Sequence, residues 1–323
     1  MKDLEYTYAV ARIRALEASL INSTVIEQLL ACSNEEQCLQ ILSEKGWGDN
    51  ETEKDAAAML KLEEEKAWKV IAEVAPDMAV FDVLSSAKLY HNLKAAVKQV
   101  CTEGKYDHIF YDDCSIPGDV MVQIVENKEF YRLPGNMAEA GQEAFNTLLR
   151  TRDGQLCDLI VDKAALEAIY EAGQKSDAEI IKNYAESTVA IANIKIAVRS
   201  AKTGKSLDFM KRAMAECDSL HVDQLAKAAT GGVDAVKEYL LDTSYAEGAA
   251  ALEESASAFE RWCDNRMIET IKPQKYKAFS AGPLVAYLLA RENEIKTVRI
   301  ILTGKQNDFP DEAIRERIRE MYV

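Results

Sequence analysis

Similar helical runs occur three times at even spacing along the chain. The spacing from Lys94 to Lys195, and again from Lys195 to Lys296, is 101 residues. Around each lysine apolar residues recur at steps of three and four, the pattern of an amphipathic helix. Each run reaches a Gly-Lys pair, where glycine suits the left-handed residue past a helix end and lysine suits the negative end of the helix dipole. These pairs are Gly104-Lys105, Gly204-Lys205 and Gly304-Lys305. Self-similarity at a fixed period indicates repeated structural units, so the sequence predicts three related helical units.

Length and composition agree with this division. A chain of 323 residues is too long for one ordinary hydrophobic core, and three units of about a hundred residues match the usual domain size. We place the units at residues 1–105, 106–205 and 206–323. Only 14 Gly and 6 Pro occur, as expected for a mostly helical protein, because both residues interrupt helices. The predicted fold class is therefore all-α.

Several helix ends can be predicted from local signals. Capping boxes place helix starts at Thr24 and Ser33, and Ser206 is expected to cap a short helix. One helix is expected over residues 245–267, and Gly282-Pro283 is expected to start the last long helix. Residues 105–118 are the least helical stretch, and we predict a connector there with one short strand.

Charge and cysteine content exclude some classes of protein. The formal net charge of −15 opposes binding to nucleic acid or to an anionic membrane surface. The first five residues have no apolar core and are not expected to form a signal peptide, and the longest apolar run, 281–290, is half the length needed to span a bilayer. Seven cysteines without a CxxC pair indicate reduced thiols in a cytoplasmic protein, most of them in the core.

No motif of catalysis or ligand binding stands out. The three histidines, His91, His108 and His221, lack zinc-ligand spacing. The sequence Gly204-Lys205-Ser206 could end a phosphate-binding loop, but Arg199 stands where that motif needs glycine, and the segment follows a predicted helix. We therefore predict no catalytic, cofactor or metal site. A Cys–His nucleophile pair assembled only in space stays open.

Two asparagines precede the repeated lysines. Asn92 and Asn193 occupy equivalent positions two residues before Lys94 and Lys195, and Glu294 takes this position in the third run. We interpret the asparagines as a helix-to-helix hydrogen bond that recurs because the unit was duplicated, rather than as ligands.

Several stretches resemble the C subunit of the bacterial and archaeal V-type (A-type) ATP synthase, the counterpart of the d subunit of the eukaryotic vacuolar ATPase. The resemblance spans the chain, and the middle third is weakly matched. It is carried by Tyr8–Glu17, Tyr90–Lys94, Leu284–Lys296, Arg299–Lys305 and, most specifically, the closing stretch through Glu312–Arg317. The family often has an acidic residue three places before the asparagine, where this chain has Leu89 and Ala190.

The resemblance implies a mechanical role. Proteins of this family are funnels of three helical units around a pseudo-threefold axis. They cap the membrane ring of proteolipid subunits on its cytoplasmic side and receive the end of the central shaft, which is made of the D and F subunits. This implies a non-catalytic rotor subunit, peripheral on the cytoplasmic face of the cell membrane, in ATP-linked proton or sodium transport. Shaft contacts would be sought among Lys94, Lys195, Lys296 and Arg299, although an ordinary exposed helix face explains these residues equally well.

Two other classes remain as alternatives. A helical-repeat scaffold could bind other protein partners, but open solenoids usually have shorter periods of about 20 to 50 residues. An all-helical enzyme could assemble its residues only in space, but the chain carries no ligand motif. The rotor subunit is the preferred hypothesis.

Overall fold

The computed structural model describes residues 5–102, 104 and 109–323, and in that part every regular element is a helix. The predicted all-α class is confirmed. The predicted strand in 105–118 is wrong for the described residues 109–118, which form no strand, while residues 105–108 lie outside the described part. The chain separates into two compact units, described here one at a time.

Unit 1 combines the two ends of the chain. It takes Met1–Val80, Ala178–Ile180 and Glu247–Val323, of which residues 1–4 lie outside the described part. Its helices are α2 (Thr7–Glu17), α3 (Ser23–Leu30), α4 (Glu35–Glu44), α5 (Ala56–Val74), most of α14 (Ala246–Glu254), α15 (Ala256–Ile271), α16 (Gly282–Gln306) and α17 (Asp311–Arg315), with short 3-10 turns η1 (Met78–Phe81, up to Val80) and η3 (Lys272–Tyr276).

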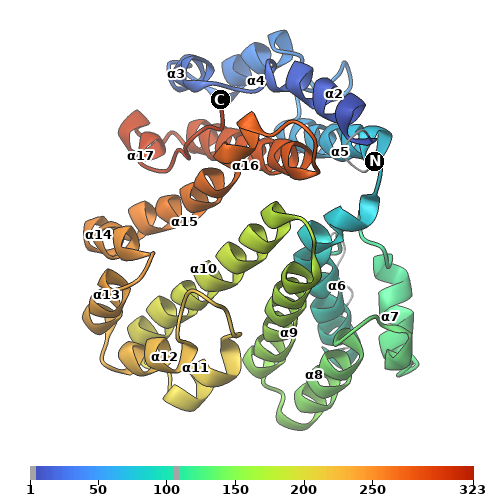
Figure 1. Ribbon diagram of the computed structural model, residues 1–323, viewed down its shortest axis with the longest axis vertical. Coiled ribbons are helices and arrows are strands. Elements are labelled where there is room, and N and C mark those ends of the chain that lie inside the picture. Colours follow the sequence, from blue (N-terminus) through green and yellow to red (C-terminus); the bar gives the residue numbers. More distant parts are fainter. Residues whose placement is uncertain (1–4, 103, 105–108) are drawn as a thin grey trace. The chain divides into compact units, whose positions relative to one another are not determined.

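Helix α16 is the centre of unit 1. It contacts α2, α4, α5, α15 and α17 (Figure 1). Its first fourteen residues are buried except Glu292, which is partly buried; residues 282–290 are apolar or small on all sides, whereas 291–294 are polar. Pro283 lies in its first turn, which confirms the predicted start. One buried core joins apolar side chains from residues 21–60 to others from 295–314.

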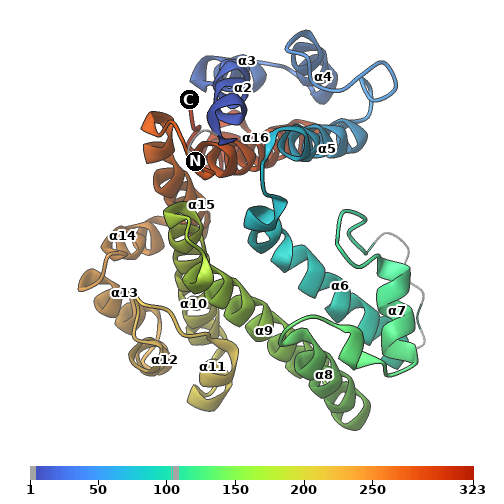
Figure 2. The same cartoon turned by 45° about the vertical axis from the view of Figure 1, so that its right-hand side comes forward.

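Unit 2 takes Phe81–Asp177 and Ile181–Ala246. Its helices are α6 (Asp82–Thr102), α7 (Gly118–Glu126), α8 (Met137–Thr151), α9 (Gly154–Lys175), most of α10 (Glu179–Thr203), α11 (Leu207–Ala213), α12 (Val222–Thr230) and α13 (Val233–Leu241), with the 3-10 turn η2 (Phe130–Arg132). Figure 2 shows α6 and α9 side by side, with α7 and α8 gathered around one end of α6, and these four helices share one core.

Close backbone approach joins two long helices of unit 2. Gly173 of α9 is buried, and a Cβ atom there would lie 2.4 Å from the Cβ of Ala185 in α10. No rotamer change relieves contact with an alanine Cβ, so the two helices can be this close only because residue 173 lacks a side chain.

Local sequence signals predicted where helices occur more accurately than where each helix begins and ends. Ser206 caps α11 as predicted, its hydroxyl accepting from the Phe209 N–H. Elsewhere the caps are Asn22 and Asn34, not Thr24 and Ser33, because these asparagines have the extended backbone that a cap requires. The single helix expected over 245–267 is two helices, since the Ser255 hydroxyl caps a new start by accepting from the Ala258 N–H.

The three-unit division at 1–105, 106–205 and 206–323 stays a prediction, as does the pseudo-threefold funnel. The three repeated lysines do lie on three of the longest helices: Lys94 on α6, Lys195 on α10 and Lys296 on α16. The buried cores pair residues 21–60 with the end of the chain, and residues 90–101 with 121–165.

Candidate functional site

Asn92 and Asn193 make the same pair of hydrogen bonds on two different helices. Asn92 donates to the carbonyl oxygen of Tyr111 and accepts from its N–H, both at 2.9 Å. Asn193 donates to the carbonyl oxygen of Ala215 at 2.7 Å and accepts from its N–H at 3.1 Å. The expected helix-to-helix bond is therefore wrong: Asn92 holds the main chain of the segment that follows its own helix, and Asn193 holds the main chain of the segment between α11 and α12, one short helix further on.

The equivalent position of the third helix makes different contacts. Glu294, on α16, is 2 % exposed and accepts a hydrogen bond from the Ile21 N–H. Its Oε2 lies 2.5 Å from Nη1 of Arg291, which occupies the register position of Leu89 and Ala190. Those two apolar residues pack into the interior of unit 2. The polar network at this position therefore exists only on α16.

Arg291 also crosses to another helix. Its Nη2 lies 2.5 Å from Oε2 of Glu63 on α5, and its guanidinium lies over the ring of Trp47, 4.9 Å from the centroid. The other oxygen of Glu63 accepts from the Gly48 N–H at 2.9 Å and from Lys66 at 2.6 Å. One buried guanidinium thus joins α5, α16 and the segment before α5.

Burial dominates the electrostatics of this network. It raises the pKa of Glu294 to about 7, with Glu63 adding to the rise and Arg291 opposing it. The pKa of Arg291 is raised by the two carboxylates, against the effect of burial. Above pH 7 a charged Glu294 therefore shares the Arg291 guanidinium with Glu63, and Lys66 lies at the edge of the network.

The stability of unit 1 should fall as the pH rises towards 7. Between the ordinary glutamate pKa of 4.5 and about 7, folded Glu294 binds a proton that the unfolded chain has released. The free energy of unfolding should therefore decrease across this window, by about 1–3 kcal/mol, and level off above it. Urea unfolding at several pH values measures this slope. Glu294→Gln should flatten it, because glutamine keeps the hydrogen-bond acceptor without titrating; equal slopes for both proteins would contradict the prediction.

Lys94 and Lys296 make ion pairs with neighbouring helices. Lys94 lies 2.7 Å from Asp162 of α9, and Lys296 lies 2.6 Å from Asp264 of α15. Lys195 is partly buried, and Arg299 is exposed on α16. The structure places these four candidate shaft contacts on three helices, and Lys94 and Lys296 make their ion pairs within their own unit. Whether any of them meets a partner stays a prediction.

The Gly-Lys pairs are not equivalent. Gly204 has φ +63° just past α10, as predicted, whereas Gly304 lies inside α16, where a Cβ would meet the Ile314 side chain at 2.6 Å. The backbone of Asp308, not Gly304, is left-handed at the end of α16. Lys105 lies outside the described residues. Glycine at 304 therefore permits close packing of α17 instead of ending the helix.

Buried Lys305 connects α16, near the end of the chain, to α3, near its start. Its ammonium donates to the carbonyl oxygen of Leu30, the last residue of α3, at 2.7 Å, and lies 2.8 Å from Asp311. It therefore satisfies the negative end of α3 rather than that of its own helix. A pocket of about 310 Å³ opens beside it, lined by Ala31, Cys32, Ser33, Lys305, Asp308, Phe309 and Asp311.

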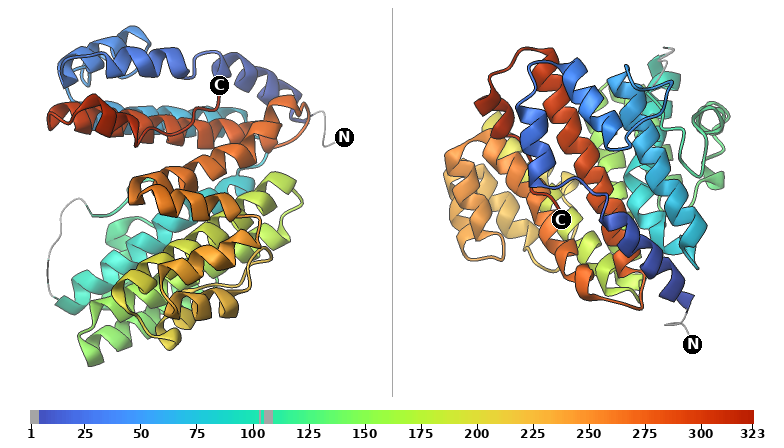
Figure 3. Two further views of the ribbon diagram at one scale, coloured as in Figure 1. Left: turned by 90° about the vertical axis from the view of Figure 1, so that its left-hand side faces the viewer. Right: turned by 90° about the horizontal axis from the view of Figure 1, so that it is seen from above.

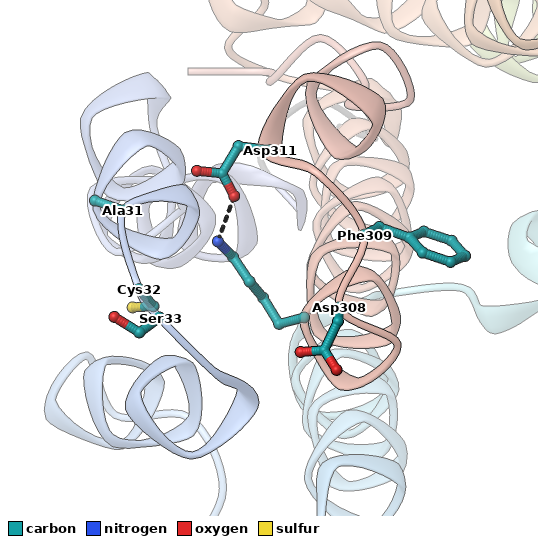
Figure 4. A pocket seen from close by; sticks show the side chains of 7 residues that line it. Ala31, Cys32, Ser33, Asp308, Phe309 and Asp311 are labelled. Carbon is teal, nitrogen blue, oxygen red and sulfur yellow. Dashed lines mark hydrogen bonds and ion pairs between the residues drawn. The ribbon is translucent and has the colours of Figure 1, made fainter.

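This pocket is a poor anion site. Figure 4 shows Asp311 pointing toward the ammonium, with Cys32 and Ser33 across the pocket and Phe309 turned away. The cation is already bonded, and Asp308 and Asp311 add two carboxylates that repel a phosphate. The pocket therefore belongs to the packing of α3 against α16 and α17.

The Gly204-Lys205-Ser206 segment is a turn between helices. Gly204 follows α10, Ser206 caps α11, and the Lys205 ammonium lies 3.1 Å from the side-chain oxygen of Gln155. The prediction that this segment follows a helix instead of a strand is confirmed. A phosphate-binding loop needs a strand before it, so this geometry does not provide one.

Most of the cysteines are buried in the interior. All seven cysteines are free, and six are buried. Burial raises the pKa of Cys157 to about 12 and that of Cys217 to about 11, which disfavours the thiolate that a nucleophile needs. His91 lies 3.0 Å from the carbonyl oxygen of Ile109, and His108 lies outside the described residues.

Neither a metal cluster nor a membrane span occurs in the described part of the chain. It contains no group of three or more His, Cys, Asp or Glu side chains placed to hold a metal ion. Among helices in the same part of the chain, none combines the length and apolar character needed to cross a bilayer.

Comparison with known proteins places the chain in one family. The model of the ATP synthase (C/AC39) subunit family matches residues 9–317. The chain belongs to this family. It is similar to the C subunit of the V-type sodium ATPase of Enterococcus hirae, with 24% identity over 99% of both chains. It is also similar to the C subunit of the A-type ATP synthase of Methanocaldococcus jannaschii, with 24% identity over 96% of this chain and 85% of the relative.

Family membership indicates what kind of assembly the chain belongs to. A member of this family is a subunit of a membrane-associated ATPase complex and therefore has partner subunits.

Sequence reasoning missed the buried network of Glu63, Arg291 and Glu294. One signal could have found it: the register position that carries asparagine twice carries a charged residue on α16, with a second charge one helical turn earlier.

Proposed function

We propose that this chain is the non-catalytic central-stalk subunit of a V/A-type ATP synthase or ATPase. In this role it couples a shaft made of the D and F subunits to the proteolipid ring, on the cytoplasmic face of the membrane, for ATP-linked proton or sodium transport. The observation that carries the proposal is the full-length similarity to the C subunit of a V-type ATPase, over 99% of both chains.

The internal bonding of the chain supports a coupling role. A part that transmits rotation must resist deformation, and tightly packed helices do so. Connecting segments are held by bidentate asparagines in unit 2, and the two chain ends are held by Arg291 and Lys305 in unit 1. These contacts all lie within the chain and resist its deformation, as a subunit that transmits rotation requires.

We also propose that three related units, at 1–105, 106–205 and 206–323, surround a pseudo-threefold axis. The repetition of the Asn92 contact at Asn193, 101 residues later, supports a duplicated origin for at least two of the long helices. An experimental map of the assembled complex tests this: α6, α10 and α16 should superimpose by successive rotations of about 120°.

Affinity purification tests the function. A tagged chain expressed in its native cells should bring down the D and F subunits and the ring protein from detergent-solubilised membranes. Recovery of the tagged chain free in the soluble fraction, without these subunits, would contradict the proposal. Recovery with unrelated soluble proteins would favour a helical scaffold.

A further inference from the structure

The loop before α16 exposes large apolar side chains at the surface of unit 1. We call residues 272–279 the lysine–aromatic loop; its sequence is Lys-Pro-Gln-Lys-Tyr-Lys-Ala-Phe. Tyr276 is 89% exposed and Phe279 is 56% exposed. Exposed aromatic side chains gathered in one short segment are typical of an interaction site, because leaving both in water forgoes the free energy of their burial.

The same loop is locally basic in an acidic chain. No Asp or Glu occurs between Glu269 and Glu292, although the chain has 54 acidic residues. The positive charge of Lys272 is balanced by ion pairs with Glu269 and Glu320. The remaining positive charge lies beside the aromatic rings, on Lys277, which is exposed, and on Lys275, which lies over the ring of Tyr322.

Hydrogen bonds from α2 hold the backbone of the lysine–aromatic loop in place. Arg14 of α2 donates to the carbonyl oxygens of Gln274 and Lys277, at 2.6 and 2.9 Å. Gln274 is 8% exposed, and the Lys277 N–H donates to its carbonyl oxygen. Both views of Figure 3 show this loop beside α2 at one end of unit 1. The aromatic side chains therefore stand on a backbone that needs little ordering when a partner binds.

We infer that the lysine–aromatic loop binds an acidic surface of another protein in the complex, an inference that rests on the proposed function. Protein interfaces concentrate their binding energy in aromatic anchors, and a preorganised backbone lowers the entropic cost of binding. The adjacent lysines select a partner of opposite charge. A protein surface is favoured over an anionic lipid surface because the family of this chain implies partner subunits, and lipid is treated as the alternative outcome of the test.

Binding to a complex purified without this chain tests the inference. The full-length chain is titrated onto the detergent-purified ATPase complex from cells that lack it. The double variant Tyr276→Ala, Phe279→Ala should raise Kd at least about tenfold. Lys277→Glu should raise Kd and make binding less sensitive to salt. Matched controls are Tyr131→Ala, which removes a tyrosine that is 79% exposed in unit 2, and Lys182→Glu on exposed α10 surface.

The possible outcomes separate this inference from the function. If the unaltered chain binds the complex and the loop variants bind equally well, the loop inference is overturned and the proposed function stands. If the unaltered chain does not bind, both are overturned. If the chain instead sediments with vesicles of equal phosphatidylcholine and phosphatidylglycerol, and the loop variants lose only that binding, the partner is lipid and the inference is wrong.

Discussion

Replacing Arg291 with methionine is expected to lower the free energy of unfolding of unit 1 by about 3–5 kcal/mol. Methionine fills much of the same volume but leaves Glu63 and Glu294, 3% and 2% exposed, without the guanidinium between them. An uncompensated buried charge costs far more than a lost surface contact. Urea unfolding, followed by circular dichroism and by the fluorescence of nearby Trp47, measures the change.

Two further variants separate charge from packing. Arg315→Met removes an ion pair with Glu27 at a similar distance, 2.5 Å, but both partners are more than half exposed. This control should cost much less than the buried change, because water and salt screen an exposed ion pair. Adding Glu63→Gln and Glu294→Gln to Arg291→Met should recover much of the loss, because no buried charge remains. A cost for Arg291→Met no larger than that of Arg315→Met would refute this account.

Removing the two asparagines should have unequal effects. Asn193→Leu leaves the N–H and carbonyl oxygen of Ala215 without partners at a residue that is 1% exposed, which should cost about 2–4 kcal/mol. Asn92→Leu frees the same groups of Tyr111, which is 43% exposed, so water can replace the lost bonds. Its cost should be about 1–2 kcal/mol.

Hydrogen exchange tests this difference locally. The amide of Ala215 should lose protection in Asn193→Leu while amides in the middle of α10 keep theirs, because the contact holds a connecting segment and not the helix. Equal unfolding midpoints for the two variants would show that exposure of the partner main chain does not decide the cost.

The helical class could be predicted from the sequence because its signals are local. Apolar periodicity around Lys94, Lys195 and Lys296 depends only on residues within a few turns, and all three lie on long helices. The repeat also pointed to Asn92 and Asn193 as equivalent positions, and they do make equivalent hydrogen bonds.

The partners of those residues could not be predicted. Tyr111 and Ala215 lie 19 and 22 residues after their asparagines, in segments without periodicity. The Arg291–Glu63 pair joins residues 228 positions apart, and no local signal in one chain reports such a contact. The predicted cap positions at Thr24 and Ser33 were wrong by one or two residues. Asn22 and Asn34 compete with these hydroxyls for the cap, and tertiary packing sets which residue becomes extended.

The placement of α16 has a consequence for how the protein is made. The helix around which unit 1 packs is synthesised more than two hundred residues after α3, α4 and α5, which share its core. While the ribosome is still translating, these early helices have no completed interior, whereas α6 to α9 find their mutual partners within about a hundred residues. Unit 2 should therefore mature first, and the newly made N-terminal segment needs protection from aggregation until α16 emerges.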